Sequence, residues 1–420
     1  MFTIKAYHNP YLRVGQHTMQ AIISLGVDAH LQLEPAPLAL AIALDRSGSM
    51  EGTKIRAARN GAIKVVQALD ASMLFMIVAF NDQARVIFGP VLGTSENKLR
   101  AINAIQNVNA ANGTRMSTAL HTVVDKLGND QSRATKILFL TDGRNEGELR
   151  TALERAVARC HEARIGISAW GIGVDWDERE LRFMADATHG SADIIPTPNQ
   201  IEGAFTASFN EMRKTAIMNA SMSFWTPGGV MIKRVQQVYP SIVQLGTETD
   251  PSNARQTLVS LGSFAAGDQR DYLLDLEMLA YEPGQQFLLV RPSIKYSVPG
   301  AGEQIEKSTQ TGWVFVQWTE DMALSAQIEE HIAHYTNQEE LAQAIKEGQE
   351  ALAAGDTARA TALLGNALTI SERTGNEKIT RLLHTIVMRD NKGTVHLNVQ
   401  ADAVARKTLA INVGRTSKLK

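Results

Sequence analysis

The sequence predicts an α/β protein in which a doubly wound, mostly parallel sheet is inserted into a β-sandwich and followed by a C-terminal helical region. Between residues 38 and 213, short apolar runs alternate with amphipathic helical patterns. This alternation is typical of a parallel sheet with helices on both faces. Residues 2–33 and the stretch after residue 214 instead show the two-residue period of antiparallel strands. Helical periodicity returns between residues 321 and 389.

The composition is that of a folded protein of several domains, with 420 residues, 44% hydrophobic and 20% charged. A net charge of −2 gives no electrostatic reason to expect nucleic acid or an anionic membrane as a partner. Cys160 is the single cysteine, which excludes an internal disulfide and a cysteine metal cage. Because the N-terminus lacks a signal-peptide pattern and no apolar run reaches membrane-spanning length, we expect a cytoplasmic protein.

The chain is expected to divide into five segments. They are the first part of the β-sandwich (1–36), the α/β domain (37–213), the second part of the sandwich (214–320), a helical bundle or hairpin (321–389), and a C-terminal strand and tail (390–420). We join the two β segments into one sandwich because each is poor in helix and would expose unprotected strand edges alone.

Within the α/β domain, the uninterrupted apolar run Leu38–Leu44 predicts a strand buried on both faces. The other elements follow in chain order: helix 54–69, strand 73–80, antiparallel edge strand 84–90, helix 95–107 capped by Ser95, helix 116–127, strand 135–143, helix 149–163, strand 165–174, helix 177–187, strand 192–196 and closing helix 201–213. In the C-terminal region, Glu350–Asn376 resembles part of a tetratricopeptide hairpin. Fewer than three repeats are visible, which favours a helical bundle over a solenoid.

Oxygen-bearing side chains follow three of the predicted segments. Asp45, Ser47 and Ser49 come directly after the buried strand, Thr114 lies in ANGTRMSTAL, and Asp142 ends ILFLTDG. Carboxylate and hydroxyl oxygens suit a hard divalent cation, and the carboxyl ends of strands are where open α/β sheets bind ligands. The alternative is that the first three residues only cap a helix, as Asp and Ser often do. A cap, however, does not require Thr114 and Asp142.

These motifs resemble the metal-ion-dependent adhesion site of von Willebrand factor type A domains, and the resemblance to a bacterial-type member covers about residues 38–213. All three parts occur in the family's order. The resemblance implies direct metal binding by three hydroxyls, and binding by two carboxylates either directly or through water. The hydroxyls are those of Ser47, Ser49 and Thr114, and the carboxylates are those of Asp45 and Asp142. Mg²⁺ is the expected ion, with Mn²⁺ or Ca²⁺ as alternatives.

The resemblance implies a non-enzymatic interaction module, in which the metal binds an acidic side chain of a protein partner. Relatives often work beside AAA+ ATPases, kinases or phosphatases, so these are the implied classes of partner. Two alternatives stay open: a metal-dependent hydrolase that uses the same ion, and a scaffold with a vestigial metal site. A hydrolase needs a general base near the metal, and Glu51 and Glu146 are the only His or Glu residues in the motif loops.

Overall fold

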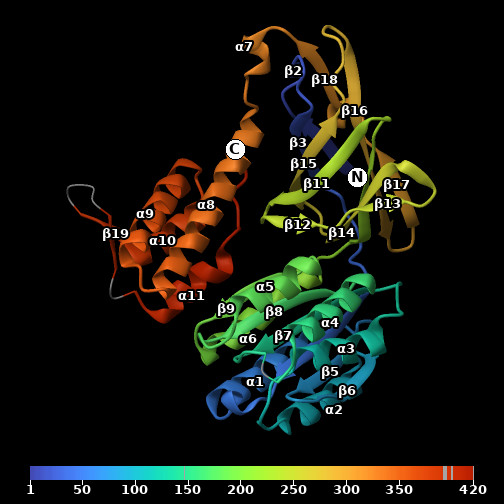
Figure 1. The fold of residues 1–420 in the computed structure, drawn as a ribbon. Coiled ribbons are helices and arrows are strands. Elements are labelled where there is room, and N and C mark those ends of the chain that lie inside the picture. The colour runs from blue at the N-terminus through green and yellow to red at the C-terminus, as the bar shows by residue number, and fades with distance from the viewer. Residues whose placement is uncertain (146, 391–394, 399–400, 420) are drawn as a thin grey trace. The chain divides into compact units, whose positions relative to one another are not determined.

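The computed structural model describes residues 1–145, 147–390, 395–398 and 401–419. The chain forms two compact units (Figure 1). One unit combines Met1–Leu33 with Asn219–Lys420, and the other is Glu34–Met218. The α/β unit therefore interrupts the sequence of the β-rich unit, and the predicted fold class is confirmed.

The α/β unit is built on a six-stranded sheet. Its order is β6 (Ala84–Leu92), β5 (Leu74–Phe80), β4 (Leu38–Asp45), β7 (Ala134–Thr141), β8 (Gly166–Ile172) and β9 (Ser191–Ile195). β6 pairs with β5 in the antiparallel sense, and the other neighbours are parallel. The edge strand predicted at residues 84–90 is thus present. The central strands β4 and β7 end side by side at one edge of the sheet, which is where the candidate site lies.

All eight residues of β4 are buried, as expected for a strand with helices on both faces. Leu38, Leu40, Ile42 and Leu44 share a core with α1 (Thr53–Ala68), α2 (Ser95–Gln106) and α6 (Ile201–Met212). Because successive side chains alternate, the intervening alanines point to the opposite face. The helices on that face are α3 (Met116–Leu127), α4 (Arg150–Glu162) and α5 (Glu178–Ala187) (Figure 1). Short 3-10 turns lie at η1 (Gly48–Met50) and η2 (Pro198–Gln200).

One cap differs from the prediction. α2 begins at Ser95, but its N-cap is Thr94, whose side chain accepts a hydrogen bond from the backbone N–H of Asn97. Thr and Ser both cap helices, so the two adjacent residues could not be separated by sequence alone.

The β-rich unit holds two sheets. The first has the order β1 (Phe2–Tyr7), β3 (Thr18–Val27), β15 (Gln269–Met278), β11 (Val230–Tyr239) and β12 (Val243–Leu245). The second has the order β13 (Glu248–Asp250), β14 (Asn253–Phe264), β10 (Ile217–Trp225), β16 (Gln286–Val298), β18 (Val314–Thr319) and β2 (Tyr11–Arg13), with β17 (Gly302–Lys307) paired to β16 and the turn η3 (Gln310–Gly312) before β18. β3 lies between β1 and β15, so strands from both ends of the chain share one sheet.

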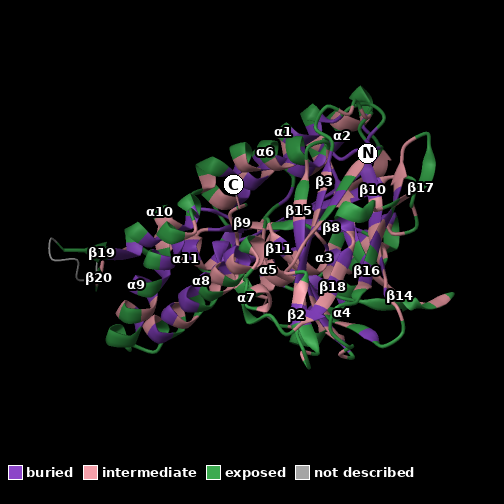
Figure 2. Ribbon diagram, turned by 90° about the horizontal axis from the view of Figure 1, so that it is seen from above, coloured by how far each residue is buried: buried purple, intermediate pink, exposed green. Residues whose placement is uncertain are grey.

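The C-terminal region is a helical bundle. It contains α7 (Met322–Ser325), α8 (Glu330–Ala353), α9 (Thr357–Arg373), α10 (Glu377–Ile386), β19 (Val387–Arg389), β20 (Val395–Leu397) and α11 (Ala403–Asn412). α8 and α9 form the expected hairpin, and each has one buried and one exposed side (Figure 2).

The structure corrects the prediction of a strand and tail over residues 390–420. A short strand is present, but α11 follows it, and its Leu409 is fully buried in the core of the bundle. Asp402 caps this helix by accepting a hydrogen bond from the backbone N–H of Ala405. The segment after α11 is also attached: the side chain of Thr416 bonds to the backbone of Val238 in β11. The parts of the prediction that fall on residues 391–394, 399–400 and 420 lie outside the described residues.

Among the described residues, no helix has both the length and the apolar character needed to cross a bilayer.

Candidate metal centre

Asp45 and Asp142 lie at the ends of neighbouring parallel strands. Leu44 of β4 pairs with Leu140 of β7, so Asp45 lies beside the Thr141–Asp142 pair. Both carboxylates are fully buried, with 0% of their surface exposed. Buried carboxylates are rare without a partner that compensates their charge. The sheet register thus brings two such groups to one point at the carboxyl edge.

The loop after Asp45 is a tight turn that directs hydroxyls back toward the strand end. The backbone N–H of Ser47 donates a 2.7 Å hydrogen bond to Oδ1 of Asp45. The hydroxyl oxygens of Ser47 and Ser49 lie 3.1 Å apart. A Cβ atom at Gly48 would come within 2.8 Å of Oδ1 of Asn112, so glycine lets this side chain pack closely against the turn. The loop thereby holds the hydroxyls of Ser47 and Ser49 close together at the end of β4.

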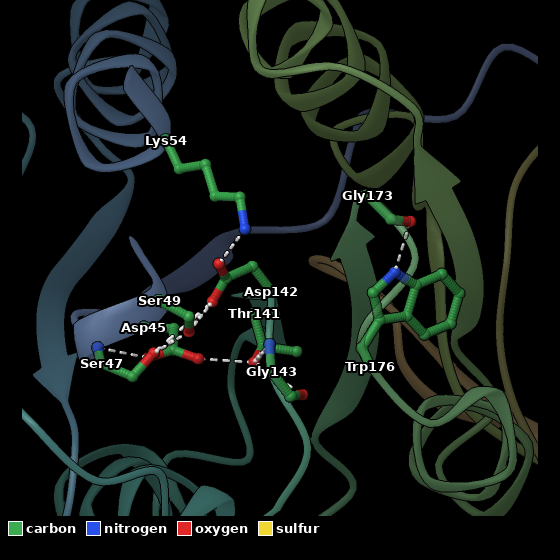
Figure 3. Close-up of polar contacts among 9 residues, drawn as sticks. All are labelled: Asp45, Ser47, Ser49, Lys54, Thr141, Asp142, Gly143, Gly173 and Trp176. Carbon is green, nitrogen blue, oxygen red and sulfur yellow. Dashed lines mark hydrogen bonds and ion pairs between the residues drawn. The ribbon is translucent and has the colours of Figure 1, made fainter. Parts of the chain in front are cut away.

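Asp142 divides its two oxygens between two kinds of partner (Figure 3). Its Oδ1 accepts hydrogen bonds from Ser49 Oγ at 2.7 Å and from Ser47 Oγ at 3.5 Å. Its Oδ2 lies 2.5 Å from the ammonium of Lys54, in the first turn of α1. One oxygen therefore faces the hydroxyls, and the other is held by a cation that sequence analysis did not identify.

Thr114 reaches the same place from the loop before α3. Its side chain is buried, with 6% of its surface exposed. A Cβ atom built on Gly143 would lie 3.6 Å from Ser49 Oγ and 3.7 Å from Thr114 Oγ1. The two hydroxyls therefore both border the space above Gly143. The structure brings together all five residues that the sequence singled out: Asp45, Ser47, Ser49, Thr114 and Asp142.

A residue that sequence analysis missed fixes the helix after Thr114. Glu148 accepts hydrogen bonds from the backbone N–H of Ser117, at 3.1 Å, and from its hydroxyl. Asn145 accepts a further bond from the backbone N–H of Met116, at 3.0 Å. These two side chains satisfy N–H groups at the start of α3 that a helix leaves unpaired. They come from another loop, so no local spacing in the sequence could have indicated them.

The neighbouring loop after β8 is held by Trp176. Its indole N–H donates a 2.9 Å hydrogen bond to the carbonyl of Gly173 (Figure 3), and the ring is buried. A Cβ atom at Gly171 would lie 2.1 Å from this ring, so the indole packs directly on the strand backbone.

Burial is the main cause that raises the pKa of Asp45 from 3.8 to about 6, and the nearby charge of Asp142 contributes a smaller part of this increase. Hydrogen bonds from Thr141 and Ser47 oppose this increase. The cause is the cost of placing a negative charge in a poorly solvated site. A cation beside the carboxylates would relieve that cost.

The donor set fits a hard divalent cation. All five candidate ligands offer oxygen, which favours Mg²⁺, Mn²⁺ or Ca²⁺ over zinc. Within the described ranges, no group of three or more His, Cys, Asp or Glu side chains could hold a metal ion. A metal here would therefore depend on the hydroxyls as well as on the two carboxylates. Of the two glutamates considered as a general base, Glu51 is exposed, and Glu146 lies outside the described residues.

Comparisons with known proteins agree with this architecture. Residues 39–207 match the family model of the von Willebrand factor type A domain. The solved structure of a von Willebrand factor type A protein from Catenulispora acidiphila is similar over 100% of this chain and 97% of its own, with 27% identity and a TM-score of 0.91. The similarity thus includes the β-rich unit and the helical bundle.

Curated relatives match over shorter stretches. An uncharacterized protein from Synechocystis is 25% identical over 272 residues, which are 64% of this chain and 63% of that protein. Human inter-alpha-trypsin inhibitor heavy chain H2 is 21% identical over 202 residues, which are 46% of this chain and 21% of that protein. The chain therefore spans less than two thirds of the length of these relatives.

Proposed function

We propose that this chain is a non-enzymatic interaction module that binds a divalent metal ion and, through it, an acidic side chain of a protein partner. The premise is that residues 39–207 form a von Willebrand factor type A domain. The observation that supports this proposal is the meeting of two buried carboxylates and three hydroxyls at one sheet edge. Mg²⁺ is the proposed ion, and Mn²⁺ offers a spectroscopic substitute with the same preference for oxygen.

The charge of the five proposed ligands favours binding of a partner's carboxylate by the metal. Three of the five proposed ligands, Ser47, Ser49 and Thr114, are neutral hydroxyls, and only the other two carry negative charge. An ion held in this way keeps a strong attraction for a further anionic oxygen. We propose that an exposed Asp or Glu of a partner supplies that oxygen. AAA+ ATPases, kinases and phosphatases are the partner classes that the family resemblance implies.

The first test is calorimetric titration of Mg²⁺ and Mn²⁺ into metal-stripped protein. Wild type is expected to bind one ion, and Asp45→Asn, which preserves the shape of the side chain, is expected to lose this binding. Asp175→Asn is the matched control, because Asp175 is an exposed aspartate in the loop after the neighbouring strand β8. Equal binding by wild type and Asp45→Asn would contradict the site, and no binding by wild type would favour the vestigial scaffold.

The second test asks whether the bound ion accepts a carboxylate. Acetate and the uncharged, similarly shaped acetamide are titrated into the Mn²⁺-loaded protein while water-proton relaxation is followed. Displacement of metal-bound water by acetate, and not by acetamide, is expected. Hydrolysis of ester or phosphoester substrates by wild type that Asp45→Asn abolishes would favour the hydrolase instead.

A further inference from the structure

Lys54 occupies an unusual position for a cation. It lies in the first turn of α1, where the helix macrodipole disfavours positive charge. Its side chain is 27% exposed, yet its ammonium lies 2.5 Å from Oδ2 of Asp142, a carboxylate with no exposed surface. Forming an ion pair with one fully buried partner costs desolvation free energy, which only a short and well-oriented contact repays. Removing one member of such a pair destabilises the protein, because the other charge is left buried and unpaired. The ion pair therefore keeps the ammonium of Lys54 beside Asp142 as long as that carboxylate is ionised.

The pair also orients the carboxylate. With Oδ2 held by Lys54, Oδ1 is turned toward Ser49 and Ser47, the hydroxyls proposed to bind the metal (Figure 3). Lys54 and the hydroxyls therefore contact different oxygens of one side chain. A metal ion could bind among the hydroxyls and Oδ1 without requiring the oxygen that Lys54 holds.

The charges of this cluster have a further consequence. Asp45, Asp142 and Lys54 together carry one net negative charge when both carboxylates are ionised. A divalent ion converts this into one net positive charge, which the carboxylate of a partner would cancel. Without Lys54, the ion would already be neutralised by the two aspartates, and a partner's carboxylate would gain less. Such charge differences matter most at poorly solvated positions.

We propose that Lys54 is a positioning residue that shares Asp142 with the metal. It holds the carboxylate with Oδ1 facing the hydroxyls, and it weakens binding of the ion alone while strengthening the ion's attraction for a partner's carboxylate. This inference rests on the proposed function, and it adds a residue that sets the balance between metal affinity and partner affinity.

The test compares Lys54→Met, Lys54→Arg and a control, Lys64→Met. Lys64 lies on the same helix and pairs with Glu202 at 3.5 Å, with half of its side chain exposed. In the metal-free protein, Lys54→Met is expected to lower the midpoint of urea unfolding, since it leaves Asp142 buried and unpaired. Saturating Mg²⁺ should restore more stability to Lys54→Met than to wild type, because a ligand stabilises the state that it binds.

Calorimetry and the acetate titration supply the decisive readouts. Lys54→Met is expected to bind Mg²⁺ about ten-fold more tightly than wild type, while its Mn²⁺-loaded form binds acetate several-fold more weakly. Lys54→Arg keeps the charge and should remain near wild type in both. A purely structural role would move metal and acetate binding in the same direction.

The outcomes separate this inference from the proposed function. If wild type binds the metal and Lys54→Met matches it or binds more weakly, the role of Lys54 is wrong and the proposed function stands. If neither wild type nor Lys54→Met binds Mg²⁺ or Mn²⁺, both the proposed function and the inference about Lys54 are wrong. Binding by Lys54→Met alone would show that wild type does not hold the ion, which would contradict both the proposed function and the sharing of Asp142.

Discussion

The hydroxyl of Thr141 donates a 2.5 Å hydrogen bond to Oδ2 of Asp45, and neither side chain has any exposed surface. The other oxygen of Asp45 accepts from the backbone N–H of Ser47. Both carboxylate oxygens are therefore occupied by donors, one from the end of strand β7 and one from the loop after β4. Thr141 was predicted only as part of a strand, so its contact with the candidate metal ligand is new information from the structure.

Replacing Thr141 with valine should destabilise the protein and weaken metal binding. The change keeps the shape of the side chain but leaves a buried carboxylate oxygen without its donor, which costs about 1–3 kcal/mol of unfolding free energy. Urea unfolding and Mg²⁺ calorimetry measure the two effects. Thr141→Ser keeps the hydroxyl and should lose less unfolding free energy and less Mg²⁺ affinity than Thr141→Val. Thr135→Val, at a buried threonine on the same strand, is the control, and an equal loss from both valine variants would remove the special role of Thr141.

Gly143 and Gly113 are expected to respond differently to alanine. A methyl group at Gly143 would meet Ser49 Oγ and Thr114 Oγ1 at ordinary contact distances, so the fold should tolerate it while the hydroxyls become less accessible to an ion. We expect Gly143→Ala to lower Mg²⁺ affinity several-fold and to change the unfolding free energy by less than about 0.5 kcal/mol.

At Gly113, φ is +90° and a Cβ atom would lie 2.1 Å from the carboxyl carbon of Asp82. Gly113→Ala should therefore cost on the order of 1–3 kcal/mol of stability, because alanine is strained in this conformation. Thermal unfolding of the two variants, side by side, checks both expectations. A well-folded Gly143→Ala with wild-type metal affinity would show that the space above Gly143 is not used by the ion.

The sequence was sufficient for those parts of the site that depend on local order. Asp45, Ser47 and Ser49 follow a strand that is apolar throughout, and Asp142 follows another, so both could be placed at the carboxyl edge. Lys54 could not be assigned in this way, because its ion pair depends on how α1 lies against the end of β7. Contacts between segments that are distant in the sequence produce no periodic pattern or fixed spacing, so they could not be predicted from the sequence alone.

The C-terminal helix was missed for a different reason. The prediction of a tail depended on the basic residues Arg415, Lys418 and Lys420, and the segment over α11 was not considered as a helix. Its signals were the capping residue Asp402 and the spacing of the apolar side chains that reach the bundle core. Tertiary packing stabilises this short helix, whose intrinsic pattern is weak.

Asp186 on α5 provides a prediction for the dependence of stability on pH. Burial raises its pKa from 3.8 to about 6, and the positive charge of Arg182 opposes this increase. Between these two values the folded state binds more protons than the unfolded state, so the contribution of Asp186 to stability is full below pH 4 and is lost as pH rises to 6.

Asp186→Asn should remove this part of the pH dependence and raise the unfolding free energy at pH 7 by on the order of 2 kcal/mol. Urea unfolding from pH 4 to pH 7, with chelator present in all samples, measures the slope. Asp175→Asn, at an exposed position, should leave the slope unchanged. An identical slope in wild type and Asp186→Asn would show that Asp186 has an ordinary pKa.

Tyr335 on α8 and Asp271 on β15 connect the helical bundle to the first sheet of the sandwich. The Tyr335 hydroxyl donates to Oδ2 of Asp271, a residue with 1% of its surface exposed. The ring packs on Ile22, Val238 and Leu273. Within the described residues, Oδ1 of Asp271 has no hydrogen-bond partner. The tyrosine is thus the side-chain donor on which this buried carboxylate depends.

Tyr335→Phe should cost about 2–4 kcal/mol of unfolding free energy, since it leaves the carboxylate buried with neither oxygen bonded to a side-chain donor. The double variant Tyr335→Phe/Asp271→Leu removes both polar groups and should recover part of the loss, which a double-mutant cycle in urea measures. Hydrogen exchange should locate the weakening to the first turns of α8, because that is where the helix contacts the sheet. Tyr281→Phe, at a partly exposed tyrosine, is the control. If the double variant is no more stable than Tyr335→Phe, the loss comes from ring packing and the hydrogen bond contributes little.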